Sequence, residues 1–311
     1  MPEPWPSFSI VIPSFNRPRQ LATCLDSLAG LDFPRERFEV IVVDDGSSPP
    51  LADTVDEFKG RLPLALIRQE NRGPASARNA GALRASGEFV VFTDDDCTPD
   101  RDWLERLLTT LAEERDCAVG GHTDNLLVLN PFSAASQMLV DYLYGYYNRD
   151  PANARFLTSN NIAFPRRLFL AAGGFDASFR GAAAEDRELC HRWLEQGRRL
   201  RYVPEARLQH ARELGFSGYL RQHFGYGSGA WRFHTLRARR GGGTFRIEPP
   251  TFYTGLLLYP FKRQAGARGF LTAALFALSQ MAAALGFLRG ASKNAWRPDR
   301  PLAATAQVRT K

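Results

Sequence analysis

The first part of this chain alternates short apolar runs with segments in which apolar residues recur every three or four positions. The runs at 8–13, 38–43, 62–67 and 89–92 are short and bounded by turn residues, which predicts strands. The segments between them have the periodicity of amphipathic helices. Strands that alternate with helices predict an α/β fold, with a mostly parallel central sheet flanked by helices.

Two of the predicted strands lead directly into acidic residues, Asp44-Asp45 and Asp94-Asp95-Asp96. Ligands of open α/β sheets bind beyond the carboxyl ends of the strands, so these acids are candidates for a binding site. Side chains alternate along a strand, and we therefore expect Asp94 and Asp96 to point one way and Asp95 the other. Neighbouring carboxylates repel each other unless a cation compensates, and Mg²⁺ or Mn²⁺ would suit their oxygens. A solvated acidic turn is the structural alternative.

A further acidic pair, Glu185-Asp186, begins a predicted helix whose apolar face includes Leu189 and Trp193. Acids in the first turn interact favourably with the helix dipole, and this structural role alone could account for them. The same dipole should lower the pKa of Asp186 and keep this side chain ionised at neutral pH. The preceding residues 180–184 are rich in glycine and alanine, which predicts a segment that can move over a bound molecule.

The composition narrows the choice of partners. The net charge of +7 is compatible with nucleic acid, anionic lipid or phosphate-bearing substrates. The chain lacks the interleaved aromatic and basic residues of nucleic-acid-binding modules, so no nucleic-acid partner is predicted. It also lacks the glycine-rich patterns of dinucleotide-binding and P-loop sites. Widely spaced cysteines, and an N-terminal segment (1–6) without secretory features, predict a cytoplasmic location.

The C-terminal part differs in character, because residues 249–298 contain no acid. The apolar run 270–288 is just long enough to span a bilayer but is interrupted by Thr272, Ser279 and Gln280. The basic residues that flank the run are Lys262, Arg263, Arg268, Arg289, Lys293 and Arg297. We expect an interfacial or re-entrant helix on the anionic inner face of the membrane. A helix packed on the rest of the chain, or a single span, would be the alternatives.

Six motifs follow one another in an order and spacing that resemble the inverting family 2 glycosyltransferases with the GT-A fold. They are Val11–Arg17, Val43–Ser47, Arg78–Gly81, Phe92–Asp96, Gly173–Asp176 and Glu185–Asp186. The resemblance covers roughly residues 7–230. It implies a GT-A type domain with a nucleotide-sugar-binding half (1–120) and an acceptor-binding and catalytic-base half (121–240). A basic and apolar helical extension (241–311) would follow.

The resemblance also implies an activity, which is transfer of one sugar from a UDP- or GDP-sugar to an acceptor hydroxyl with inversion. The acceptor would be a glycan or a lipid-linked molecule, and the cofactor a divalent metal, Mn²⁺ or Mg²⁺. The residues implied to bind the donor are Pro13, Ser14, Asn16, Asp45, Arg78, Asp94 and Asp95. Those implied to bind the metal are Asp94, Asp96 and His210.

Within these sets the resemblance gives individual roles. Asp45 would bind the nucleotide base, and Arg78 would lie near the phosphates. Asp186 would be the general base, with Glu185 as the less favoured neighbour. Structural roles remain open for three of them: a turn residue for Asp45, a surface arginine for Arg78 and a structural histidine for His210.

One departure from the family bears on the type of transfer. Processive members carry a QxxRW motif, and the corresponding segment here, Arg221–Gly229, lacks it. This favours transfer of a single sugar over a processive polysaccharide synthase. A protein that binds nucleotide sugars without turnover is a second alternative, which the intact Asp94, Asp96 and Asp186 argue against.

Overall fold

The computed structural model describes residues 8–179, 181, 183–241 and 247–293. Some features considered above lie outside these residues, namely the segment 1–6, Arg180, Ala182, the side chain of Lys293, and Arg297.

One sheet of eight strands runs through the described part of the chain, in the order β3-β2-β1-β4-β7-β6-β8-β5. The strands are β1 (Phe8–Ser14), β2 (Phe38–Asp44), β3 (Leu64–Arg68), β4 (Phe89–Phe92), β5 (Cys97–Pro99), β6 (Cys117–Asn125), β7 (Ile162–Pro165) and β8 (Arg199–His210). The first four correspond to the four predicted runs, and they pair in parallel as expected.

The second half of the sheet is mixed. β8 is parallel to β6, whereas β7 runs antiparallel to both β4 and β6, and β5 runs antiparallel to β8. The carboxyl ends of β1, β2, β4, β6 and β8 therefore lie at the same edge of the sheet. This is the edge at which α/β proteins bind their ligands.

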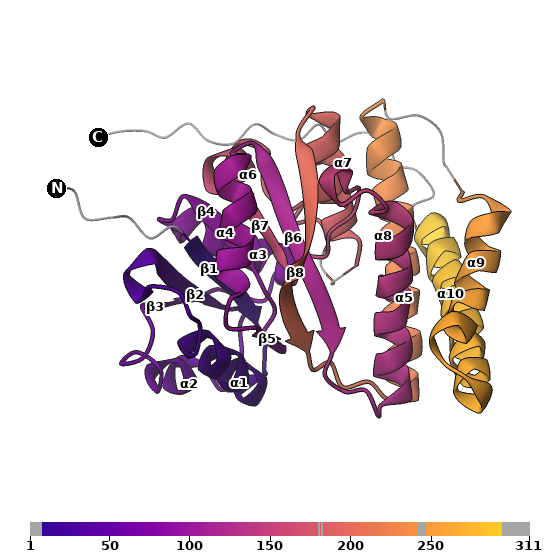
Figure 1. Cartoon of the computed structure of the whole chain (residues 1–311), viewed down its shortest axis with the longest axis horizontal. Helices are drawn as coiled ribbons and strands as arrows, with labels where there is room; N and C mark the ends of the chain where they lie inside the picture. The colour runs from indigo at the N-terminus through magenta and orange to yellow at the C-terminus, as the bar shows by residue number, and fades with distance from the viewer. Residues whose placement is uncertain (1–7, 180, 182, 242–246, 294–311) are drawn as a thin grey trace.

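Helices cover both faces of the sheet (Figure 1). One apolar core joins the sheet to α1 (Pro18–Ala29), α2 (Ala52–Asp56) and α4 (Trp103–Glu113), and a second core joins it to α3 (Pro74–Arg84), α6 (Arg166–Ala171) and α7 (Glu185–Glu195). Short 3-10 turns occur at Arg35–Arg37 and Pro151–Asn153. The α/β fold with flanking helices is confirmed.

The close packing of α3 on β1 depends on a glycine. A β-carbon at Gly81 would lie 2.4 Å from Cγ1 of Val11, so any larger residue would push the helix away from the strand. Arg78 lies about one turn earlier on the same helix. Gly81 therefore keeps Arg78 close to the edge where β1 and β4 end.

A further group of helices packs beside the sheet: α5 (Pro131–Tyr147), α8 (Phe216–Arg239), α9 (Pro250–Arg263) and α10 (Gly266–Lys293) (Figure 1). The helices α8 and α10 approach each other so closely that a β-carbon at Gly227 would lie 1.8 Å from the carbonyl oxygen of Ala283. A β-carbon at Gly286 would lie 1.9 Å from that of Phe224. Small residues at such a crossing allow the backbones to come into contact.

The helix α10 exposes several large apolar side chains, namely Met281, Leu285 and Leu288. Its buried face combines Leu275 and Phe276 with the hydroxyl-bearing residue Ser279. The segment Gly266–Ser292 is long and apolar enough to cross a membrane, judged by length and composition alone. Its most apolar stretch of 18 residues has a mean hydropathy of 1.8, and 33% of that stretch is buried. A helix with apolar residues turned outwards is unusual in water and suits contact with lipid.

Candidate active site

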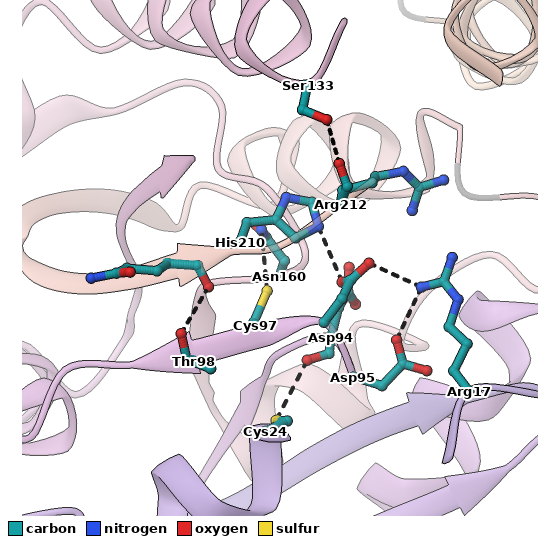
Figure 2. Close-up of polar contacts among 12 residues, drawn as sticks. Arg17, Cys24, Asp94, Asp95, Cys97, Thr98, Ser133, Asn160, His210 and Arg212 are labelled. Atoms are coloured by element: carbon teal, nitrogen blue, oxygen red, sulfur yellow. Dashed lines mark hydrogen bonds and ion pairs between the residues drawn. The ribbon is translucent and has the colours of Figure 1, made fainter. Parts of the chain in front are cut away.

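The acidic residues 94–96 lie in a turn and not in a strand, because β4 ends at Phe92. The expected alternation of their side chains is therefore wrong. Asp95 and Asp96 converge on Arg17, whose Nη1 lies 3.0 Å from Oδ1 of Asp95 and 3.0 Å from Oδ2 of Asp96. Asp94 instead accepts a hydrogen bond from Nη2 of Arg78 at 2.6 Å. Figure 2 shows Arg17 on one side of this turn and His210 on the other.

Arg17 is a site residue to which neither its sequence pattern nor the family resemblance assigns a role. It belongs to the motif Val11–Arg17 and directly follows Asn16, which has a positive φ of 56°. Burial raises the pKa of Asp95 to about 6, and the charge of Arg17 opposes this rise. Burial also acts to raise the pKa of Asp96, but the hydrogen bond and charge of His210 and the charge of Arg17 outweigh it and hold that pKa well below the usual value. Arg17 thus allows two buried carboxylates to lie side by side.

Asp96 and His210 form the best candidate metal site among the described residues. Oδ1 of Asp96 lies 3.1 Å from Nε2 of His210, and the pairing of β5 with β8 places His210 opposite Cys97. The ligand atoms of these three residues lie within 4.8 Å of one another. Burial raises the pKa of the Cys97 thiol well above its usual value, and a soft sulfur ligand suits Mg²⁺ or Mn²⁺ less well than carboxylate oxygen does.

The remaining donor set, one carboxylate and one imidazole, fits Mn²⁺ and leaves positions for phosphate oxygens and water. Asp94 does not belong to this cluster, since its carboxylate is paired with Arg78. Of the three residues expected to bind the metal, the structure thus brings Asp96 and His210 together, whereas Asp94 pairs with Arg78.

Arg78 connects the acidic turn to α7, the helix that begins with Glu185 and Asp186. It has only 2% of its surface exposed, and it donates hydrogen bonds to Asp94 and, at 3.1 Å, to Oε1 of Glu185. Its guanidinium also lies over the ring of Phe175, 5.5 Å from the ring centroid. In these contacts Arg78 binds protein carboxylates and is not open to a donor phosphate.

Glu185 and Asp186 differ in how their carboxylates are used. Glu185 is buried, and its second oxygen accepts a hydrogen bond from the backbone N–H of Ala183 at 2.7 Å. Asp186 is partly exposed. Desolvation of its carboxylate by the surrounding protein and the neighbouring charge of Glu185 nevertheless raise the pKa of Asp186 to about 7. The expectation that the helix dipole would lower this pKa is therefore wrong, because burial and like charge outweigh the dipole.

Asp45, directly after β2, joins the end of β1 to the loop between β3 and α3. Its carboxylate accepts hydrogen bonds from Nε2 of Gln69 at 2.7 Å and from the backbone N–H groups of Arg72 and Gly73, both at 2.9 Å. Its own N–H donates to the carbonyl oxygen of Ser14. These bonds fix the turn that opens α3.

The other residues expected to bind the donor lie close to Asp45 in the fold. Pro13 pairs with Val43 in the sheet. The hydroxyl of Ser14 donates to Oδ2 of Asp95 at 2.7 Å, which joins the end of β1 to the acidic turn. Oδ1 of Asn16 accepts a hydrogen bond from the N–H of Ser48. The ends of β1 and β2 thus form one connected surface.

A hollow of about 740 Å³ opens beside Asp96 and Arg17. Its remaining walls come from the segments 126–130 and 211–214, which follow β6 and β8. Its lining therefore comes from segments that follow the carboxyl ends of β1, β4, β6 and β8, and its size is that of pockets that bind small molecules.

Tyr226 on α8 is a second site residue that sequence reasoning missed. Desolvation raises the pKa of its hydroxyl to about 12, although 37% of the residue is exposed. Tyr226 lines a small cavity together with His210 and Arg212, which places it beside the proposed site. In the sequence, the segment Arg221–Gly229 is notable only for the motif that it lacks, and this gives no signal for Tyr226.

The sequence matches known proteins over a part that includes the acidic turn. Residues 9–171 match the family model described as Glycosyl transferase family 2. The pre-mycofactocin glycosyltransferase of Mycobacterium tuberculosis is 31% identical over 228 residues, which are 71% of this chain and 46% of that protein. The poly(ribitol-phosphate) beta-N-acetylglucosaminyltransferase TarS of Staphylococcus aureus is 33% identical over 123 residues, or 39% and 20% of the two chains. The matches thus span less than half of these relatives.

Solved structures share the fold. The mannosyltransferase PcManGT from Pyrobaculum calidifontis, in complex with GDP-Man and Mn²⁺, has a TM-score of 0.61 at 23% identity, covering 94% of this chain and 81% of that one. TarS 1–349 of S. aureus, in complex with UDP-GlcNAc, has a TM-score of 0.55 at 16% identity, covering 93% and 91%. The family match extends over more than half of the 311 residues and includes the acidic turn. The chain therefore belongs to glycosyltransferase family 2 and has a fold of the GT-A type.

Proposed function

We propose that the protein transfers a single sugar from a UDP- or GDP-sugar to an acceptor hydroxyl, with inversion and with the help of a divalent metal. The observation that carries this proposal is the chain of contacts from the acidic turn through Arg78 to Glu185, which lies next to Asp186. It links a carboxylate–imidazole pair fit for a metal to a carboxylate fit for a base. The GDP-Man, Mn²⁺ and UDP-GlcNAc in the two similar structures support the choice of donor and cofactor.

Asp186 is the proposed general base. It accepts the proton of the acceptor hydroxyl while that oxygen attacks the anomeric carbon, and the bond to the nucleoside diphosphate breaks on the opposite side. Attack opposite the leaving group inverts the configuration. A pKa of about 7 suits this role, because about half of the carboxylate is ionised at neutral pH and it is basic enough to take a proton. Glu185 is a positioning residue, since both of its oxygens are already bonded.

Asp96 and His210 are the proposed metal ligands. The ion pair with Arg17 holds the carboxylate of Asp96 in place beside His210. A divalent metal bound there would neutralise negative charge that develops on the leaving diphosphate. Asp94, which is outside this pair, is left to contact the donor directly.

Asp45 is the proposed contact for the nucleotide base. An ionised carboxylate offers about four lone-pair positions, and three are used by Gln69, Arg72 and Gly73. One position is left to accept a hydrogen bond from an N–H of the base. Ser14 at the end of β1 and Asn16 in the loop that follows lie next to it and complete this side of the donor site.

The C-terminal helices are proposed to hold the enzyme on the inner face of a membrane. The outward face of α10 is apolar, and the exposed basic residues Arg263, Arg268 and Arg289 surround it. This pairing of apolar area with positive charge suits an interface with anionic lipid.

A donor panel tests the proposed function. Purified protein with Mn²⁺ is incubated with UDP- and GDP-sugars, and release of the nucleoside diphosphate is followed with and without acceptors. We expect slow hydrolysis of one donor that is stimulated by an acceptor and suppressed by EDTA. Tight nucleotide binding without release from any donor would instead support a binding protein without turnover.

A further inference from the structure

Four consecutive apolar residues, Leu126–Leu129, form part of the wall of the hollow beside Asp96. We call this segment the lip. Val128 and Leu129 have 70% and 89% of their surface exposed. Single exposed apolar residues are ordinary, but a contiguous group beside a polar site indicates contact with an apolar ligand.

Hydrogen bonds at both ends hold the lip in place. The N–H of Leu126 donates to the carbonyl oxygen of His210 at 3.0 Å. At the other end, Nδ2 of Asn130 donates to the carbonyl oxygen of Leu214 at 2.9 Å, while Oδ1 of Asn130 caps the start of α5. The exposure of the lip is therefore built into the fold and does not come from a loose loop. Its first residue is bonded to the backbone of a proposed metal ligand.

The position of the lip assigns it to the acceptor. The donor base is proposed to bind at Asp45, beyond β1 and β2. The lip follows β6, which is separated from β1 in the sheet by β4 and β7. Arg17 and Asp96, proposed to act on the diphosphate side, line the same hollow. A molecule lying against the lip would thus reach the sugar from the side opposite the nucleotide base.

The lip also lies at the end of the molecule where α9 meets α10 (Figure 1). That junction carries the exposed apolar residues Phe261 and Phe270 and the basic residues Lys262 and Arg263. An acceptor held by an apolar chain at a membrane surface would approach from this end.

We propose that the lip binds an apolar chain of the acceptor next to the hydroxyl that receives the sugar. The acceptor class is then an amphipathic alcohol or glycoside, and free sugars are poor acceptors. This inference rests on the proposed function and specifies its second substrate.

The experiment compares free sugars with their hexyl and octyl glycosides as acceptors, in the absence of vesicles. Transfer is measured by nucleoside diphosphate release, and binding is measured by calorimetry with UDP or GDP and Mn²⁺ present. We expect the alkylated form to have a KM or Kd lower by about ten-fold, the effect of burying roughly two methylene groups. The double variant Val128→Ser/Leu129→Ser should lose this advantage.

Leu83→Ser is the matched control, because Leu83 is 67% exposed on α3 and lies outside the hollow. It should keep the full advantage of the alkylated form. Equal behaviour of free and alkylated forms, or an advantage that survives in the double variant, overturns the proposal. A separate flotation assay with anionic vesicles completes the test: if the double variant loses vesicle binding but keeps the advantage of the alkylated form, the lip belongs to the bilayer contact and the proposal is overturned. Failure of the proposed function shows separately, as absence of hydrolysis of every donor.

Discussion

At the scale of single residues, the site depends on charges that compensate one another across long stretches of sequence. Arg17 lies 78 and 79 positions from the carboxylates that it bridges, and Arg78 lies 107 positions from Glu185. The motifs predicted which of these residues meet at the site. They do not predict which arginine pairs with which carboxylate. Arg17 lies in a loop, and only the folded turn decides whether its guanidinium meets Asp94, Asp95 or Asp96.

The pKa of Asp186 leads to a prediction about pH. Since only the ionised carboxylate can accept a proton, kcat/KM, which reports the pKa values of the free enzyme, should fall as the pH drops through about 7. Measurements of kcat/KM between pH 5 and 9 test this. In Asp186→Asn the remaining activity should lose that limb, whereas an identical limb in the variant would assign it to another group.

The proposed ligands of the metal and of the nucleotide base lead to a prediction about nucleotide affinity. His210→Ala should remove the effect of Mn²⁺ on the affinity for UDP or GDP, because one of two protein ligands is lost. Asp45→Ala should lower nucleotide affinity and keep the effect of Mn²⁺. Calorimetry with and without EDTA separates the two outcomes. Full metal enhancement in His210→Ala would contradict the assignment of this histidine.

At the scale of elements, close contact between α8 and α10 requires glycine at two positions. Gly227→Ala places a β-carbon against the carbonyl oxygen of Ala283 and should destabilise the protein by about 1–3 kcal/mol. Gly225→Ala in the same helix meets nothing within 4 Å and should be neutral or stabilising by up to about 1 kcal/mol. Thermal unfolding of both variants is the measurement, and equal midpoints would contradict the described crossing.

The exposed face of α10 leads to a second prediction for this element. Flotation with liposomes should require anionic lipid and weaken with salt, because basic residues surround the apolar face. Leu285→Ser/Leu288→Ser should reduce binding, and Leu83→Ser should not. Protein that stays with membranes through carbonate extraction would favour a spanning helix, and equal binding to neutral vesicles would contradict the role of charge.

At the scale of the whole molecule, the sequence was most informative where structure is local. The apolar runs predicted β1 to β4 because a short buried strand leaves its mark in adjacent residues. The strands β5 to β8, in the second half of the sheet, are not among the runs that the sequence predicts. β5 has three residues and β7 has four, too few to give a pattern. The sequence also predicts the wrong direction for the pKa of Asp186. Its rise depends on burial by segments that are distant in the sequence.

The central claim is that Asp186 is the base of a sugar transfer that takes place at this edge of the sheet. The most direct test is the transfer rate of Asp186→Asn, measured together with its affinity for the donor. This substitution keeps the shape of the side chain and removes its ability to take a proton. We predict that transfer falls by roughly 10²–10⁴-fold while donor affinity is nearly unchanged. Transfer at the normal rate in Asp186→Asn would contradict the claim, and a loss confined to Glu185→Gln would move the base to the neighbouring residue.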